Sequence, residues 1–116
     1  ERFQREALIM ASLHHPHITR IIDLNQRSDS TPYIVLEYLE GESLSTRLEQ
    51  GAMSLSEVTH VLQQVGSALQ ATHSSGIIHR DLKLENIMLK LRDKLDIVVV
   101  DFFVFYIKHI AFVLRV

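Results

Sequence analysis

The 116-residue sequence contains no cysteine. This absence excludes disulfide-stapled scaffolds, thiolate zinc sites and cysteine nucleophiles. Any chemistry must therefore come from Asp, Glu, Lys, Arg, His, Ser, Thr or Tyr side chains. The 47% content of hydrophobic residues is enough for one compact domain, which at this length hides roughly two-thirds of its unfolded surface.

The chain also lacks an excess of charge of either sign. Its 12 basic and 14 acidic residues give a formal net charge of -2. A balance so close to zero gives no electrostatic reason to expect binding to nucleic acid or to an anionic membrane surface. We therefore expect neither as a partner.

Neither an initiator Met nor a signal peptide opens the sequence, which starts with Glu1, Arg2 and Phe3. A signal peptide would need a basic start followed by an apolar run. The start is typical of a segment taken from a longer polypeptide, and we expect a cytoplasmic location.

The longest apolar run lies at the other end of the chain, over residues 97–114. Asp101 and Lys108 interrupt it, and a charge near the centre of a bilayer costs about 2.5–3.5 kcal/mol on insertion scales. We therefore do not expect a membrane span. A membrane-anchored module that uses this run stays a third hypothesis, tested by partition of the chain into detergent or lipid.

The hydrophobic pattern predicts an α+β fold with the element order α-β-β-α-α-β-β. Helices are expected over residues 1–13 and 43–50 and from Ser54 onward; strands are expected over 18–24, 33–39, 86–91 and 95–100. Pro16 ends the first helix, because its ring and missing N–H forbid continuation. The first two strands form an antiparallel hairpin with a long polar loop, and the Glu40-Gly41 pair ends the second strand.

The helix that begins after Ser54 carries clear local signals. Ser54 and Glu57 have the spacing of a capping box, in which each side chain accepts a hydrogen bond from the other residue's backbone N–H. Gly76 suits the C-terminal end of this helix. The stripe expected to face the core consists of Val58, Val61, Leu62, Val65 and Leu69.

Three different kinds of functional side chain stand close together in the segment IHRDLKLEN, residues 78–86. Asp81 can accept a hydroxyl proton, Lys83 can neutralise phosphate oxygens, and the Asn86 carbonyl can coordinate Mg²⁺. The segment lies between a long helix and a strand, where catalytic loops commonly stand. A strand hairpin after Asn86 returns Asp101 close to it, so that the two can share one metal.

The segment HRDLKLEN resembles the catalytic loop of protein kinases, in the version with Lys two residues after Asp that is typical of the serine/threonine class. The resemblance covers residues 1–102 and implies a partial kinase fold: the end of the N-lobe, the hinge and the start of the helical C-lobe. It implies ATP and Mg²⁺ as cofactors. Aminoglycoside- and choline-type phosphotransferases have a related loop but lack this signature, and they are a distant second.

The resemblance assigns roles to residues of the loop and of the strand after it. It implies that Asp81 is the catalytic base, that Lys83 contacts the transferred phosphate, and that Asn86 and Asp101 hold the metal. The backbone of Glu85 would lie near the nucleotide or substrate.

The resemblance extends to segments before the loop. Glu6 matches the αC glutamate that pairs with a strand lysine, and YIVLEYLEGESL resembles the fifth strand and hinge of bacterial kinases of the eukaryotic type. Leu36 falls at the gatekeeper position, and backbone groups of Glu37 and Leu39 would bind adenine. The residues matching the hydrophobic spine are Met10, Ile21, His79 and Phe102.

The sequence departs from the kinase pattern in several places. Its four glycines are too far apart for a Gly-rich phosphate loop, and its first lysine is Lys83, so the strand lysine expected to pair with Glu6 is absent. Phe103 stands where the family has a glycine with freer backbone angles. We therefore divide the chain into a partial kinase domain, 1–102, and a hydrophobic tail, 103–116, that does not match the family.

These observations favour a fragment of an ATP-dependent serine/threonine protein kinase that is inactive on its own. Its partners would be ATP, protein substrates and missing kinase segments of the same parent chain. A non-catalytic pseudokinase remnant or binding module is the alternative. His14, His15 and His17 fit no helical face, and we interpret them as a connector rather than a metal site.

Overall fold

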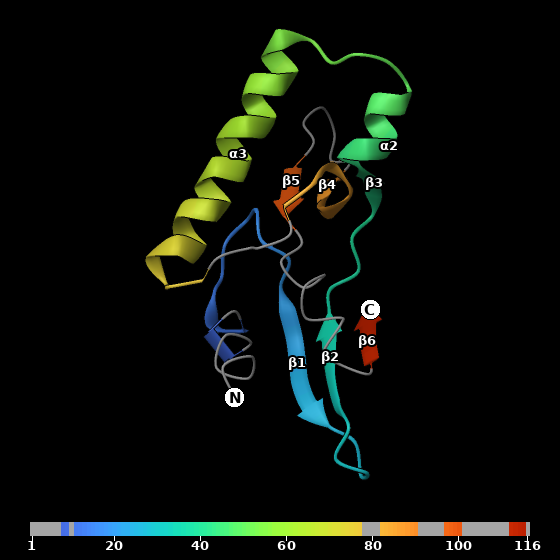
Figure 1. Ribbon diagram of the computed structural model, residues 1–116, viewed down its shortest axis with the longest axis vertical. Helices are drawn as coiled ribbons and strands as arrows, with labels where there is room; N and C mark the ends of the chain where they lie inside the picture. The colour runs from blue at the N-terminus through green and yellow to red at the C-terminus, as the bar shows by residue number, and fades with distance from the viewer. Residues whose placement is uncertain (1–7, 10, 78–81, 91–96, 101–111, 116) are drawn as a thin grey trace.

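The computed structural model describes residues 8–9, 11–77, 82–90, 97–100 and 112–115 of the chain. Its strands form two three-stranded sheets, in the orders β1-β2-β6 and β3-β4-β5. Figure 1 shows the first sheet in the lower half of the view, with helices α2 and α3 on either side of the second sheet above it.

The first sheet contains the expected hairpin. Strands β1 (Ile21–Gln26) and β2 (Pro32–Leu36) pair antiparallel, which confirms the pairing, although both strands lie at other bounds than the sequence indicated. The connecting loop is shorter than expected, because Gln26 and Pro32 already pair with each other. The run β6 (Phe112–Arg115), which the sequence analysis did not assign to a strand, pairs parallel with the other edge of β2.

The second sheet contains the second expected strand pair and one strand that was not expected. Strands β4 (Ile87–Lys90) and β5 (Ile97–Val100) pair antiparallel, and β3 (Gly41–Ser43) pairs antiparallel with β4. The prediction that the Glu40-Gly41 pair ends the second strand is wrong, because β2 already ends at Leu36 and Gly41 begins β3. The φ of +142° at Gly41 lets the chain approach β4, where a Cβ atom would lie 1.9 Å from the Leu89 carbonyl oxygen.

Helices α2 and α3 each begin directly after a serine whose side chain caps the first turn. Residues 8–9 and 11–12 are helical, and α2 (Leu44–Glu49) follows Ser43, whose side chain accepts the Thr46 N–H. Helix α3 (Leu55–Ser74) carries the predicted capping box. It ends before Gly76, whose φ of +80° and N–H bond to the His73 carbonyl confirm a C-terminal glycine turn.

The buried face of α3 differs in part from the predicted stripe. Val61 and Val65 are buried, and Leu69 is half-buried against the core, as expected. Val58 and Leu62 are 38% and 64% exposed, so their assignment to the core was wrong. The helix turns a narrower face inward, and the small or polar side chains of Ala68 and Thr72 complete it.

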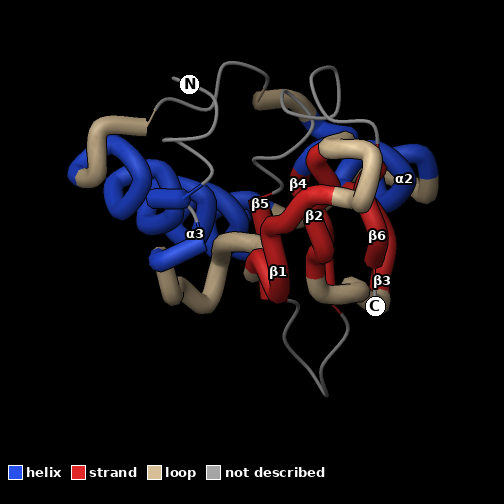
Figure 2. Tube along the Cα trace, turned by 90° about the horizontal axis from the view of Figure 1, so that it is seen from below, coloured by secondary structure: helices blue, strands red, loops and turns tan. Residues whose placement is uncertain are grey.

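One hydrophobic core joins the two sheets to α3. It includes Ile34 and Leu36 of β2, Val65 of α3, and Ile87 and Leu89 of β4. Figure 2 shows α3 on one side of the strands and α2 on the other. Within the part of the chain that the structure describes, no helix is long and apolar enough to cross a membrane.

Candidate functional site

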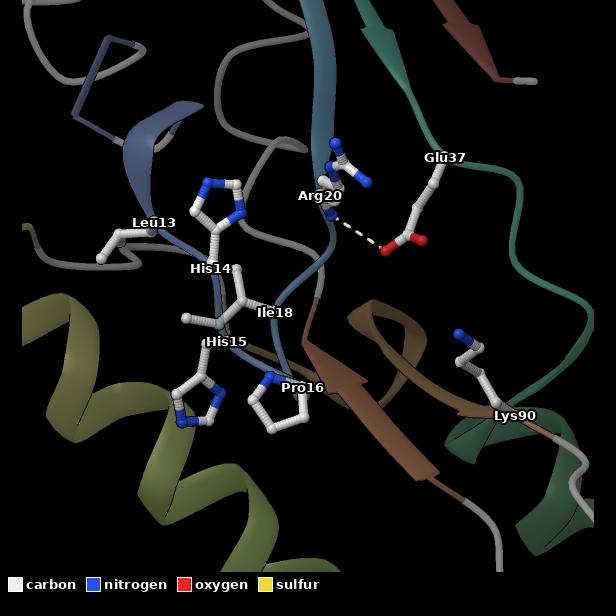
Figure 3. A pocket seen from close by; sticks show the side chains of 8 residues that line it. All are labelled: Leu13, His14, His15, Pro16, Ile18, Arg20, Glu37 and Lys90. Carbon is white, nitrogen blue, oxygen red and sulfur yellow. Dashed lines mark hydrogen bonds between the residues drawn. The ribbon is translucent and has the colours of Figure 1, made fainter.

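The segment 37–40, which connects β2 to β3, matches the position of the predicted hinge. Leu36, at the gatekeeper position, is fully buried, and Leu39 is 8% exposed. The Glu37 N–H donates to the Arg20 carbonyl at 3.1 Å, and one Glu37 carboxylate oxygen accepts the Arg20 N–H at 3.0 Å (Figure 3). This reciprocal pair fixes the Glu37 side chain on the segment that directly precedes β1.

The second group of predicted site residues lies in the short helical turn η1 (Leu84–Asn86) and at its N-cap, Lys83. The Asn86 N–H donates to the Lys83 carbonyl at 2.9 Å. The sequence analysis expected a strand that begins at Asn86. Asn86 is instead the last residue of the turn, and β4 begins at Ile87. Lys83 and Glu85 are exposed, whereas Asn86 is 5% exposed.

The β4–β5 hairpin bears on the predicted metal pair. Ile87 pairs with Val100, so the start of β4 lies beside the end of β5. Asn86 directly precedes the first of these residues in sequence, and Asp101 directly follows the second. An asparagine side-chain oxygen and a carboxylate are both hard ligands of the kind that Mg²⁺ prefers, so the residue types fit such an ion.

The hinge and the η1 turn lie near opposite ends of β4. Gly41, directly after the hinge, pairs with Lys90 at one end of β4, and Ser43 pairs with Met88 near the other end. The strand has four residues, which span about 13 Å at 3.3 Å per residue. The hinge and the η1 turn are thus separated by about the length of β4.

Several residues that the sequence singled out lie outside the described residues. These are Glu6, Asp81 and Asp101 of the predicted site, and Met10, His79 and Phe102 of the predicted hydrophobic spine. Their roles stay predictions. Of the spine positions, Ile21 is described, and it is buried in the core.

Sequence reasoning missed the contact between Arg20 and Glu37. The two residues are 17 apart in sequence, and no local motif marks them. The signal that could have found them is the hairpin register, because Ile21 pairs with Leu36 and the next pair outward is Arg20 with Glu37.

The histidine-rich connector between the first helical residues and β1 contacts α3. The His15 ring accepts the His17 N–H at its Nδ1 atom and lies 3.1 Å from the Ser67 hydroxyl at Nε2. Both nitrogens of His15 are therefore engaged by protein groups. Across the described residues, no group of three or more His, Cys, Asp or Glu side chains is placed to hold a metal ion.

A hinge between two sheets, and a Lys-to-Asn turn that leads into a β-hairpin, define the region between the two lobes of a protein kinase. Residues 1–105 match the protein kinase domain. The chain belongs to this family.

Named relatives agree with this assignment. The chain is similar to the serine/threonine-protein kinase pkn2 of Myxococcus xanthus, with 43% identity over 89 residues, 77% of this chain and 11% of that protein. It is also similar to the NUAK family SNF1-like kinase 1 of Homo sapiens, with 40% identity over 100 residues, 85% of this chain and 15% of that protein. The chain spans less than a fifth of the length of either relative.

The fold is similar to that of solved kinases. The Mycobacterium tuberculosis PknI kinase domain matches with a TM-score of 0.76 and 28% identity over 88% of this chain and 41% of that one. Rad53 in complex with AMP-PNP matches with a TM-score of 0.73 and 29% identity over 84% of this chain and 26% of that one. The structure is therefore a partial protein kinase fold.

Proposed function

We propose that this chain carries part of the active site of an ATP-dependent kinase that phosphorylates Ser and Thr hydroxyls of proteins in the cytoplasm. The observation that carries the proposal is the turn from Lys83 to Asn86. It is the second half of the HRDLKLEN segment and directly precedes the β4–β5 hairpin, within a family match that spans residues 1–105.

In this proposal the residues of the loop act mainly by positioning and charge neutralisation, as phosphoryl transfer requires. Asp81 orients the acceptor hydroxyl and takes its proton. The exposed Lys83 side chain steadies the transferred phosphate, and the backbone N–H of the buried Asn86 donates to the Lys83 carbonyl and so holds the turn in place.

Asn86 and Asp101 would hold Mg²⁺. When bound, the ion would neutralise negative charge on the nucleotide's phosphates. The oxygen-only donor pair favours Mg²⁺ or Mn²⁺ over zinc.

The hinge would bind the adenine ring through the Glu37 carbonyl, which accepts, and the Leu39 N–H, which donates. The Glu37 carboxylate accepts the Arg20 N–H, so its side chain is already engaged. Adenine would therefore be bound by backbone groups of the hinge. The length of β4 separates the hinge from the η1 turn, a span similar to that between the base and the terminal phosphate of an extended nucleoside triphosphate.

The nucleotide part of the proposal is tested by titrating the chain with ATP and with inosine triphosphate. Adenine presents a donor at its 6-position and an acceptor at N1, and hypoxanthine reverses both. We expect weak but saturable ATP binding and at least roughly tenfold weaker binding of inosine triphosphate, because both hinge hydrogen bonds would be mismatched. Equal binding of the two nucleotides would contradict adenine recognition by the hinge.

The acceptor part is tested in a protein that contains this segment within a complete kinase domain. Since Lys83 stands at the position typical of the serine/threonine class, phosphoamino-acid analysis should find phosphoserine or phosphothreonine. Products that contain only phosphotyrosine would contradict the assignment.

A non-catalytic binding module is the second candidate, and Phe103 is the observation that favours it. A phenylalanine disfavours the backbone angles that a glycine allows at that position. A complete domain with this sequence that binds ATP but transfers no phosphate, and transfers it once Phe103→Gly is introduced, would support this candidate.

A further inference from the structure

A cavity of about 420 Å³ lies behind the hinge, bounded by the histidine-rich connector, the segment that directly precedes β1, Glu37 and the end of β4. We call it the rear pocket. Its apolar wall consists of Leu13, Pro16 and Ile18. The volume falls in the range of pockets that hold small organic molecules.

The polar groups of the rear pocket carry an excess of positive charge. Arg20 and Lys90 line it together with one carboxylate, that of Glu37, and Figure 3 shows these three side chains around its upper and right-hand side. His15 also lines the pocket, but both of its ring nitrogens contact protein groups. Among the described residues of the lining, Arg20, Lys90 and Glu37 together carry a formal charge of plus one.

Neither cation of the rear pocket is neutralised within the part of the chain that the structure describes. The ion pair found there joins Arg47 to Glu57, and neither of these residues lines the pocket. The Glu37 carboxylate accepts the backbone N–H of Arg20 rather than its guanidinium. Two unpaired cations in a concave site concentrate anions from solution.

We propose that the rear pocket binds a small organic monoanion, a carboxylate joined to an apolar body. One negative charge balances the net charge of Arg20, Lys90 and Glu37. A guanidinium and an ammonium both donate charge-assisted hydrogen bonds to a carboxylate, and the apolar body would pack on Leu13, Pro16 and Ile18. The site lies on the rear side of Glu37 and does not depend on nucleotide binding by the hinge.

The test is a titration of the isotope-labelled 116-residue chain with phenylacetate at neutral pH and low ionic strength, followed by amide NMR shifts. We expect saturable shifts around Arg20 and Glu37. The neutral analogue phenylacetamide should bind roughly tenfold more weakly, because it lacks the charge that strengthens the hydrogen bonds. Equal affinities for the two compounds, or no saturation of phenylacetate below about 10 mM, would overturn the proposal.

Three variants assign the binding to the rear pocket. Arg20→Gln and Lys90→Gln should each weaken phenylacetate binding roughly tenfold, whereas Arg27→Gln, with the same change of charge in the β1–β2 loop, should leave the affinity unchanged. Glu37→Gln keeps an acceptor for the Arg20 N–H but removes the negative charge, and it should strengthen binding by a few-fold. The amide spectrum of each variant shows whether it is folded. Unchanged affinity in both Arg20→Gln and Lys90→Gln, or weaker binding in Glu37→Gln, would overturn the proposal.

A titration with inorganic phosphate tests whether the rear pocket prefers a carboxylate with an apolar body to another anion. Inorganic phosphate should bind more weakly than phenylacetate, because it has no apolar body to pack on the pocket wall and its second charge has no partner. Tighter binding of phosphate would overturn the assignment to a carboxylate.

Discussion

Thr19 and Thr72 are both buried, with 1% and 0% of their surface exposed, but their hydroxyl groups differ in hydrogen bonding. The Thr72 hydroxyl donates to the Leu69 carbonyl at 3.0 Å. The Thr19 hydroxyl has no hydrogen-bond partner among the residues that the structure describes. A buried polar group without a partner lowers stability by about 1–3 kcal/mol.

Replacement of these two threonines by valine should therefore have opposite effects. Thr19→Val removes an unsatisfied hydroxyl and should raise the free energy of unfolding by about 1 kcal/mol. Thr72→Val removes a hydrogen bond and leaves the Leu69 carbonyl with one partner fewer, so it should lower that free energy by a similar amount. Urea unfolding of the two variants measures both. A loss of stability in Thr19→Val as large as that in Thr72→Val would show that the Thr19 hydroxyl is satisfied in solution.

Gly41 and Gly66 form a second matched pair. A Cβ atom at position 41 would meet the Leu89 carbonyl oxygen at 1.9 Å and would stand on a backbone with a φ of +142°, whereas a Cβ at Gly66 in α3 meets nothing within 4 Å. We expect Gly41→Ala to lower stability by at least about 2 kcal/mol and Gly66→Ala to raise it by about 0.5–1 kcal/mol. Thermal unfolding of both variants is the measurement, and equal midpoints would contradict the close approach of β3 to β4.

At the scale of single elements, the capping box of α3 makes stability depend on pH. Glu57 accepts the Ser54 N–H at 2.9 Å, and the Ser54 hydroxyl accepts the Glu57 N–H at 3.1 Å. These contacts with Ser54, and the Arg47 guanidinium at 3.9 Å, lower the pKa of Glu57 from its ordinary value of 4.5. A lowered pKa in the folded state means that the stabilisation is complete above pH 4.5 and is lost as the pH falls through the folded-state pKa.

Glu57→Gln isolates this effect, because glutamine can still accept the Ser54 N–H but does not titrate. On acidification to below about pH 4, the unfolding temperature of the parent chain should fall more than that of Glu57→Gln. The Thr31 hydroxyl and N–H lower the pKa of Asp29 as well, but Asp29 is present in both chains and its contribution cancels. Parallel pH profiles of the two chains would contradict the assignment.

The elements that the sequence predicted correctly are those with a local cause. The Ser54–Glu57 spacing predicted the start of α3, and Gly76 its end. Strand β3 was missed because it is short and exists through its pairing with β4, which is distant in sequence. The exposure of Leu62 was missed for a related reason, since periodicity defines an apolar stripe but not how much of it the rest of the fold covers.

In the candidate site, too, residues of a contiguous motif were predicted, whereas a contact between distant residues was not. The contiguous HRDLKLEN segment predicted that Lys83, Glu85 and Asn86 stand together, and they share one turn. The anchoring of Glu37 by Arg20 was not predicted, because it depends on a register that continues past the last paired residues of β1 and β2. Contacts of that kind require the fold before the residues can be named.

At the scale of the whole molecule, the sequence contains the complete HRDLKLEN segment of the proposed catalytic loop but only some of the residues that the proposed nucleotide site would need. The Asn86 N–H and the Lys83 carbonyl form an ordered turn, and one core contains residues of β2, which leads into the hinge, and of β4. The 116 residues contain no Gly-rich phosphate loop and no lysine before Lys83. If the proposed function holds, the loop that would orient the acceptor lies within these 116 residues, whereas the glycine loop and the strand lysine that would hold the phosphates of ATP do not.

We therefore predict that the 116-residue chain transfers no phosphate to a protein acceptor above the level of an Asp81→Asn control. Well-oriented reactants gain on the order of 7–11 kcal/mol over freely diffusing ones, and a nucleotide held at its base but not at its phosphates forfeits part of that gain. Phe103, in place of a glycine beside Asp101, adds to the loss. Radiolabelled ATP and a generic Ser/Thr-rich acceptor provide the measurement, with equal incorporation expected for the two chains. Transfer that the parent chain catalyses and Asp81→Asn abolishes would contradict the prediction, and it would mean that the phosphates are held by groups other than a glycine loop and a strand lysine.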